Sequence, residues 1–287
     1  MRIGFRILAA ALAVLGVAAT ADERLAEAHR LYNSTNFEQS LKVLQAIQPK
    51  NGEVYELMGR NYYMQADYKH ATDSIEKAFA IEPNNAVYAL WLGRAWGRRA
   101  ETSSPFTAPV YASKARQYLE RSVQLNPMNL EAQSDLFEYY LQAPGFLGGG
   151  LDKAEGLAQQ MSRISPAEGQ FAEARLAEKR KESRTAEAHL RRAVELAPHQ
   201  IGKIIELARF LTRQGRYQEA EQSFARAEQL APNSPKLTFE RAAIYIESHH
   251  NLDTAQELLK RYMNMEVDPD DPPKSEAAKL LRQANRG

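Results

Sequence analysis

Apolar and small residues recur three and four positions apart along most of the chain, in short runs separated by polar turns. Positions with this spacing share one face of a helix, so each run predicts an amphipathic helix with one buried stripe. Residues 52–85 predict two such helices, joined by a turn at residues 66–68. Their apolar or small positions are Tyr55, Met58, Gly59, Tyr62, Ala71, Ile75 and Ala78.

The same order of residues returns further along the chain. In residues 201–234 it reads Ile204, Leu207, Ala208 and Leu211, then the turn Gly215-Arg216-Tyr217, then Ala220, Phe224 and Ala227. Prolines punctuate the units at Pro83, Pro127, Pro166, Pro198 and Pro232. Because proline cannot continue a helix, each is predicted to end the second helix of its unit.

Each unit also places small residues where its two helices would cross. The first helices carry Gly59, Gly93, Ala174, Ala208 and Ala242, and the second helices carry Ala71, Ala115, Ala154, Ala186, Ala220 and Ala255. With little bulk at the crossing, two antiparallel helices can approach at the short end of the roughly 8–10 Å range for helix pairs. The chain is therefore predicted to be a series of closely packed helix hairpins.

These motifs resemble the tetratricopeptide repeat, and the resemblance covers most of the chain. It implies an all-α, right-handed α-solenoid of about seven hairpins within residues 22–268. The expected units are 22–51, 52–85, 86–129, 130–168, 169–200, 201–234 and 235–268. Beyond an acidic, proline-containing stretch, Ala277, Leu280, Leu281 and Ala284 lie on one helix face. Residues 269–287 are therefore expected to form a C-terminal capping helix, which an open solenoid end requires.

The first 21 residues have the pattern of a secretory signal peptide. Arg2 and Arg6 precede an apolar stretch at residues 7–18, and Ala19-Thr20-Ala21 offers a small-x-small cleavage site. The stretch is shorter than the roughly 20 residues of a membrane-spanning helix. We expect a periplasmic or secreted protein, with an uncleaved signal anchor as the alternative. The chain has no cysteine, which excludes disulfides and thiolate metal sites.

Composition excludes some partners. The chain is 44% hydrophobic and 25% charged, as in folded globular proteins, and its formal net charge is +1. Removing a leader with Arg2 and Arg6 changes this to about −1. Such a balance provides no general attraction to nucleic acid or to anionic lipid. We expect neither nucleic-acid binding nor membrane insertion after signal cleavage.

The family resemblance places a partner-binding groove on the concave face, along the first helix of each hairpin. Arginine follows the small residue in four units, Glu138 takes that place in the fourth unit, and aromatic residues lie nearby. Arginines among aromatic rings suit an extended peptide, because guanidinium groups bind carbonyls and carboxylates and flat rings offer contact area. The alternative is a solvated face on which arginine favours helix formation. The expected groove residues are Arg60, Tyr63, Trp91, Arg94, Glu138, Phe171, Arg175, Arg209 and Phe239.

Some tetratricopeptide-repeat proteins grip a C-terminal carboxylate with lysines and asparagines on successive first helices. That clamp is not carried over to this chain. The matching positions hold Glu56, Arg60, Leu90 and Arg94, with no asparagine.

Two units contain extra residues at the turn between their helices, at residues 103–109 and 144–150. Both turns are expected on the same edge of the solenoid, where Phe106, Phe146 and Leu147 form edge loops for a partner. The glycines of the second turn do not form a phosphate-binding loop. Leu151 and Asp152 follow them, in place of the required lysine and hydroxyl residue.

The six histidines have no metal-ligand spacing, and no acid–base constellation is evident. His249 and His250 offer at most a weak metal site in a turn. We therefore expect no catalytic residues, no metal and no cofactor. The leading interpretation is a non-catalytic periplasmic scaffold that binds a peptide or partner protein in its groove. The alternative is a structural subunit of a cell-envelope assembly or export complex that uses its edge loops. The oligomeric state is left open.

Overall fold

The computed structural model describes residues 20–284, and in this range it contains only helices. The predicted signal peptide lies outside the described residues except for Thr20 and Ala21. The helices are α1 (Ala21–Asn33), α2 (Phe37–Gln45), α3 (Gly52–Met64), α4 (Tyr68–Ile81), α5 (Ala86–Glu101), α6 (Ala108–Leu125), α7 (Leu130–Gln142), the 3₁₀ turn η1 (Gly145–Leu147), α8 (Leu151–Ile164), α9 (Pro166–Lys179), α10 (Ser183–Leu196), α11 (Ile201–Arg213), α12 (Tyr217–Leu230), α13 (Pro235–Glu247), α14 (Leu252–Met263) and α15 (Lys274–Ala284).

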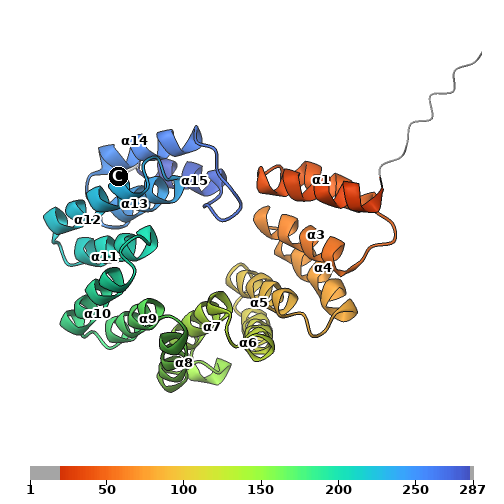
Figure 1. The fold of residues 1–287 in the computed structure, drawn as a ribbon, viewed down its shortest axis with the longest axis horizontal. Coiled ribbons are helices and arrows are strands. Elements are labelled where there is room, and N and C mark those ends of the chain that lie inside the picture. Colours follow the sequence, from red (N-terminus) through yellow and green to blue (C-terminus); the bar gives the residue numbers. More distant parts are fainter. Residues whose placement is uncertain (1–19, 285–287) are drawn as a thin grey trace, which may run out of the picture.

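Successive hairpins stack into an arc that almost closes into a ring (Figure 1). The odd-numbered helices from α3 to α13 lie on the inner side of the arc, and their even-numbered partners lie on the outer side. Helix α1 and the α14–α15 pair stand at the two ends, on either side of the opening. This all-α arrangement confirms the predicted solenoid. Its inner helices together form the concave face.

Side-chain caps begin most of the inner helices. Asn51, Asn85 and Asn129 each accept a hydrogen bond from a backbone N–H in the first turn of the helix that follows. Such a cap satisfies one of the donors that a helix N-terminus leaves unpaired. Ser165 and Ser234 do the same for α9 and α13. The polar residues between units therefore set where each hairpin begins.

All five prolines lie two residues after the end of an outer helix, as expected, but Pro166 differs from the others because it also begins the next inner helix. It is the first residue of α9, and Ser165 caps this helix directly after α8 ends at Ile164. Proline suits the first turn of a helix because its missing N–H would have no partner there. The fifth hairpin thus begins at Pro166, three residues before the expected unit boundary.

The glycines of the inner helices lie at close helix crossings. A Cβ atom on Gly59 would stand 2.2 Å from Cγ1 of Ile75, and one on Gly93 would stand 2.6 Å from Leu119. Ala71 and Ala115 are buried one turn earlier in the same outer helices. The small residues therefore permit the close approach, and the side chain nearest to the glycine is the large one that follows the alanine.

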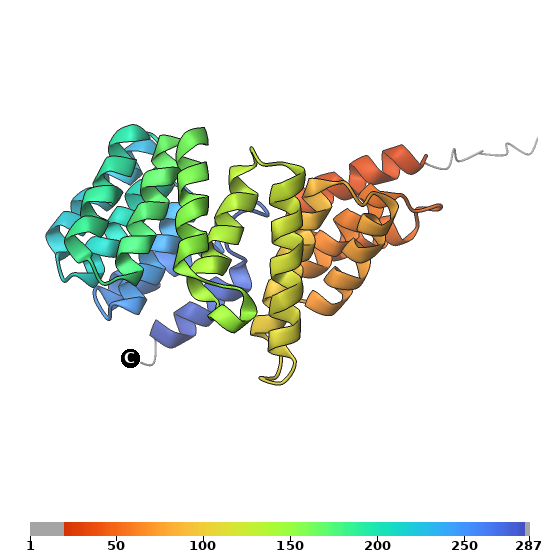
Figure 2. The same cartoon turned by 90° about the horizontal axis from the view of Figure 1, so that it is seen from below.

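The extra residues of the third unit mainly lengthen its helices. Helices α5 and α6 contain 16 and 18 residues, while most of the others contain 13 or 14. The expected loop at residues 103–109 is shorter than predicted, because α6 already begins at Ala108 and Pro109 lies in its first turn. The α5–α6 turn projects beyond the neighbouring hairpins along one edge (Figure 2).

The C-terminal helix α15 covers the last hairpin. Ala277 and Ala284 are buried, while Leu280 and Leu281 pack against the core formed by α9 to α14. The predicted capping helix is therefore confirmed within the described residues. It shields apolar surface that the last repeat of an open stack would otherwise expose.

Candidate partner-binding groove

Ion pairs connect neighbouring inner helices across the concave face. Arg94 on α5 lies 2.5 Å from Asp135 and 2.7 Å from Glu131, both on α7. Arg175 on α9 reaches back to Glu138 on α7, with Nε and Nη2 donating to the two carboxylate oxygens at 3.0 and 3.1 Å. Helix α7 is therefore tied to the helices on both of its sides.

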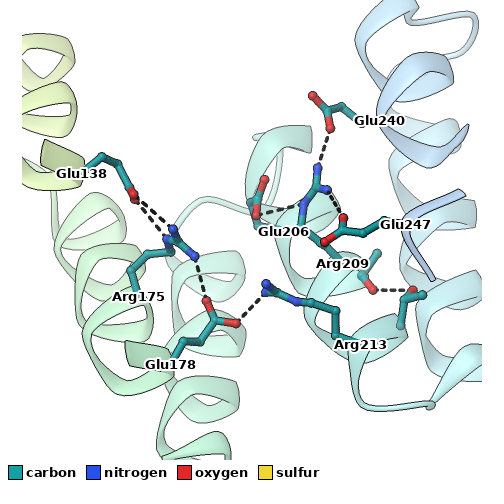
Figure 3. A network of polar contacts seen from close by, with 10 residues as sticks. Glu138, Arg175, Glu178, Glu206, Arg209, Arg213, Glu240 and Glu247 are labelled. Atoms are coloured by element: carbon teal, nitrogen blue, oxygen red, sulfur yellow. Dashed lines mark hydrogen bonds and ion pairs between the residues drawn. The ribbon is translucent and has the colours of Figure 1, made fainter. Parts of the chain in front are cut away.

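The same arrangement continues toward the C-terminus (Figure 3). Arg209 on α11 contacts Glu240 and Glu247 on α13 at 2.5 and 3.3 Å. Arg213, one turn further along α11, contacts Glu178 on α9 at 2.6 Å. We call this set the ion-pair ladder. It comprises Arg94, Glu131, Asp135, Glu138, Arg175, Glu178, Glu206, Arg209, Arg213, Glu240 and Glu247.

Burial affects the charges of the ladder. The hydrogen bonds that Arg175 donates to the carboxylate of Glu138 raise the pKa of Arg175 further above its already high value. Burial raises the pKa of Asp135 and of Glu206, and the neighbouring arginines only partly oppose this effect. These carboxylates are thus incompletely compensated for the water they have lost.

The ladder changes the role of three predicted groove residues. Arg94, Arg175 and Arg209 were expected to offer their guanidinium groups to a ligand, but carboxylates of adjacent helices already hold them. Glu138 is likewise held by Arg175. The stacking angle of the hairpins brings each arginine next to acidic residues of a neighbouring repeat. Spacing within one repeat could not show this relationship.

Arg60 has a different environment. Its guanidinium carbon lies 4.7 Å from the ring centres of both Tyr32 and Trp91, which is a cation–π arrangement. Its nearest carboxylate is Glu56, at 3.6 Å. Burial raises the pKa of Glu56 to about 7. Tyr32 Oη, Glu56 Oε1 and Arg60 Nε are buried without a hydrogen-bond partner among the described residues.

The two ends of the solenoid approach each other near this cluster. Burial is the main cause of the raised pKa of Tyr32 on α1, and the carboxylate of Asp270 contributes to the rise. Asp270 belongs to the loop between α14 and α15, which faces α1 and α3 across the opening (Figure 1). The acidic loop therefore borders the entrance to the concave face.

A hollow of about 500 Å³ opens on the concave face between α5, α6 and α7. We call it the α5–α7 pocket. Its floor consists of small or apolar residues, Gly93, Gly97, Ala112, Ala115 and Leu119. Its walls include Tyr63, Arg94, Asp135 and Glu138, and its rim includes Pro144 and Leu147. Groove and edge-loop residues that the sequence suggested separately thus line one pocket.

Glycine is needed at two places around this pocket for different reasons. A Cβ on Gly97 would have Ala115 Cβ as its nearest neighbour, at 4.0 Å, so its absence leaves open space in the floor. A Cβ on Gly149 would stand 1.8 Å from the carbonyl oxygen of Ala143, so a side chain cannot fit there. Gly149 therefore lets the chain turn tightly at the rim.

Hydrogen bonds hold this rim in place. Tyr139 Oη donates to the carbonyl of Leu147 at 2.9 Å, and the Gly150 N–H donates to the carbonyl of Tyr140 at 2.9 Å. Gly148 adopts a positive φ of 86°, which glycine accepts without strain. The glycine-rich turn thus serves to fold the rim over the end of α7.

The remaining candidate aromatics lie outside the pocket. Phe239 is only 5% exposed and packs against Tyr262, so its prediction as a groove residue is wrong; the side chain fills the core between α13 and α14. Phe171 is partly buried under Lys203, whose Nζ lies 4.2 Å from the ring centre. Phe106 and Phe146 are 93% and 81% exposed on the edge turns.

Sequence reasoning missed several pocket residues, including Gly97, Ala112, Asp135 and Tyr139. Asp135 lies three residues before Glu138 on the same face of α7, and this spacing was an available signal. Gly97 lies one turn after Gly93 on α5, and this spacing could have indicated a second position where no side chain fills the space beside the helix. The pocket itself depends on the position of α7 against α5 and α6, which the pattern of one repeat does not contain.

The histidine turn that the sequence offered as a weak metal site contributes to packing. His250 stacks on the ring of Tyr217, with centres 3.8 Å apart. Within residues 20–284, no three histidine, aspartate or glutamate side chains are grouped so that they could hold a metal ion. No helix of the described range has the length and apolar character needed to cross a bilayer.

Comparison with known proteins agrees with this architecture. Residues 211–284 match a family model described as tetratricopeptide repeat. A tetratricopeptide-repeat protein from Parabacteroides merdae has a similar structure, with a TM-score of 0.60 and 14% identity over 92% of this chain and 98% of that one. A thermophilic tetratricopeptide-repeat protein from Thermus thermophilus aligns with a TM-score of 0.52 and 18% identity, over 71% of this chain and all of that one. No curated protein matches the sequence.

The described residues have the fold of a tetratricopeptide-repeat solenoid, and residues 211–284 match the tetratricopeptide-repeat model. Proteins of this class act as scaffolds for protein–protein interaction. A protein-binding role is therefore the function that the fold supports.

Proposed function

We propose that the protein is a non-catalytic scaffold that binds a segment of a partner polypeptide along its concave face. The observation that carries this proposal is the α5–α7 pocket, which combines a small apolar floor with charged and aromatic walls. Such a site accepts one large side chain and positions the residues beside it. The pocket opens directly onto the ion-pair ladder, so a bound segment would follow the inner helices.

The ladder suits a binding surface because it is already ordered. Each arginine is held by carboxylates from a neighbouring helix, and a ligand would not need to organise these long side chains. Preorganisation reduces the conformational entropy that is lost on binding. The same pairs maintain the spacing of the inner helices.

Site-specific photo-crosslinking tests this proposal. Gln142 lines the pocket and is exposed at the end of α7, whereas Gln159 is exposed on the outer helix α8. A photoreactive residue at 142 is expected to crosslink a partner, and one at 159 is not. Adding Gly97→Leu to the first variant should abolish its crosslink, because leucine would occupy the pocket. Equal crosslinking from both positions would contradict the groove assignment.

We also propose that the protein is exported to the periplasm by its N-terminal signal, with retention as an uncleaved anchor as the alternative. The support is the order of charged, apolar and small residues in positions 1–21. N-terminal sequencing of the protein from separated cell fractions distinguishes these outcomes. A cytoplasmic chain that retains Met1 would rule out export.

A second candidate function is a structural subunit of a cell-envelope assembly that contacts its partners through the edge turns. Phe106 and Phe146 are 93% and 81% exposed on the α5–α6 and α7–α8 turns, and Val110 in the first turn of α6 is 57% exposed. Exposed aromatic residues of this kind are common in interfaces. Phe106→Ser with Phe146→Ser should release the partner under this reading, while Gly97→Leu should not. The opposite result favours the groove.

A further inference from the structure

The ion-pair ladder contains more carboxylates than guanidinium groups. Seven acidic side chains face four arginines, which leaves three negative charges in excess. The acids are Glu131, Asp135, Glu138, Glu178, Glu206, Glu240 and Glu247; the arginines are Arg94, Arg175, Arg209 and Arg213. The arginines, which first suggested an anion-binding groove, are therefore outnumbered within the ladder.

A further positive charge nearby would stabilise the ionised form of several of these carboxylates. Asp135 and Glu206 are partly buried, and burial raises the pKa of each despite the arginine beside it. A cation placed nearby stabilises an incompletely compensated carboxylate. An approaching carboxylate would instead add repulsion. The electrostatics of the ladder thus favour a cationic guest.

The entrance to the concave face also carries negative charge. Asp268, Asp270 and Asp271 lie in the α14–α15 loop, which borders the opening beside α1 (Figure 1). Asp270 is close enough to influence the ionisation of Tyr32 on the opposite end. Lys236 acts on Asp271 and offsets part of this charge. A guest that enters through the opening therefore passes an acidic rim.

Basic residues also line parts of the inner surface, and Arg98 joins Arg94, Glu101, Asp135 and Glu138 around the α5–α7 pocket. Lys179 and Lys181, together with Arg175 and Arg213, line a separate hollow of about 530 Å³ at the turns that end α9 and α11. These lysines stand at the edge of the solenoid, beyond the ladder. Their positive charges would repel a cationic guest, which would therefore bind along the carboxylates of the ladder and not at this edge.

We propose that the concave face recognises a basic polypeptide segment with one large apolar side chain, which enters the α5–α7 pocket. This inference rests on the proposed groove-binding function and names the chemistry of its ligand. The pocket of about 500 Å³ holds the apolar side chain against Gly97 and Ala115. Asp135 and Glu138 on its wall then face lysine or arginine residues next to the anchor.

Three labelled peptides of equal length test the proposal by fluorescence anisotropy with the full chain. One contains tryptophan among lysines, the second contains tryptophan among glutamates, and the third contains serine among lysines. The first is expected to bind at least about tenfold more tightly than either of the others, a difference of about 1.4 kcal/mol. Its affinity should fall as salt is added, because the charge contribution is screened.

Paired variants separate the ladder from the overall charge. Glu131→Gln with Glu247→Gln removes two exposed ladder charges, while Arg94 keeps Asp135 and Arg209 keeps Glu240. The control, Glu195→Gln with Glu257→Gln, removes two exposed charges from the outer helices α10 and α14. We expect at least a threefold loss of affinity for the basic peptide in the first pair only. An equal loss in both pairs would overturn the assignment to the ladder.

The anchor has its own variant. Gly97→Leu should reduce binding of the tryptophan–lysine peptide to the level of the serine–lysine peptide, with an unchanged circular dichroism spectrum. If Gly97→Leu leaves the affinity unchanged, the pocket is not the anchor site. Tighter binding of the glutamate peptide would overturn the basic specificity and leave groove binding intact. No binding of any of the three, together with no crosslink at position 142, would refute the groove function itself.

Discussion

Arg175 on α9 donates two hydrogen bonds to the carboxylate of Glu138 on α7, at 3.0 and 3.1 Å, and so joins the inner helices of two successive hairpins. The planar guanidinium matches the two carboxylate oxygens, which fixes both distance and orientation. Both side chains also line the concave face, Arg175 in one hollow and Glu138 in the α5–α7 pocket. The pair therefore stabilises the stack at the place where we expect a partner to bind.

Removing this pair should weaken the middle of the solenoid. Arg175→Met is expected to lower the free energy of unfolding by about 1 kcal/mol, because Glu138 would lose its partner while remaining partly solvated. Denaturant titration followed by circular dichroism measures the change. Arg192→Met is the control, since its pair with Glu195 is exposed on α10 and lies within one helix. Equal effects of the two substitutions would show that the bridge between helices contributes nothing beyond a surface pair.

Glu56 should make the stability depend on pH. Burial raises the pKa of this carboxyl to about 7 in the folded protein, well above its ordinary value of 4.5. The folded state therefore binds the proton more tightly than the unfolded state. Stability from this group is full below pH 4.5 and is lost as pH rises through 7, by an amount on the order of 3 kcal/mol.

The variant Glu56→Gln isolates this contribution. The free energy of unfolding of the variant minus that of the wild type should increase between pH 4.5 and pH 8, because glutamine has no charge to bury. Because the other titratable groups are the same in both proteins, their contributions to the pH dependence cancel in this difference. A difference that stays constant over this interval would mean that Glu56 ionises with an ordinary pKa.

The rim of the α5–α7 pocket offers a matched pair of glycines. Gly149→Ala should destabilise the turn by roughly 1–3 kcal/mol, because the new Cβ would overlap the carbonyl oxygen of Ala143. Gly145→Ala should have little effect, since nothing lies within 4 Å of the place its new methyl group would take and its φ is not positive. Thermal unfolding and hydrogen exchange at residues 143–150 check both. Similar behaviour of the two variants would contradict the turn geometry.

The approach of the two ends can be measured with spin labels. The chain has no cysteine, so cysteines introduced at Asn33 and Glu266, both exposed, can be labelled selectively. Electron–electron distance measurements are expected to show one narrow population at short range, because the α14–α15 loop faces α1. A broad distribution centred on long distances would show that the ring stands open.

Much of the fold could be predicted from the sequence. The spacing of Leu207, Leu211 and Phe224 predicts a helical hairpin, and Pro232 predicts where it ends. Both predictions depend only on residues that are close in the sequence. The limits of local reasoning show at Pro166, where the same residue type begins a helix. Pro166 both follows the end of α8 and begins α9, and only the structure shows that Ser165 alone separates these two helices.

The candidate site was less predictable. Arg94 and Arg175 were identified as concave-face residues, but their carboxylate partners lie 37 to 41 positions away, on adjacent repeats. Phe239 shared the spacing of a groove residue and yet is buried against Tyr262. These outcomes depend on how one hairpin is rotated against the next, and that rotation is set by side-chain packing across the whole interface.

The amino-acid sequence by itself determined the helices, their pairing through glycine and alanine, and the number of hairpins, because these follow from helical periodicity and from contacts between neighbouring segments. Only the tertiary structure decided that the inner arginines are held by carboxylates, that α7 closes a pocket against α5 and α6, and that the acidic α14–α15 loop borders α1. Those relationships join residues of different repeats, and the superhelical stacking of all the hairpins brings them together.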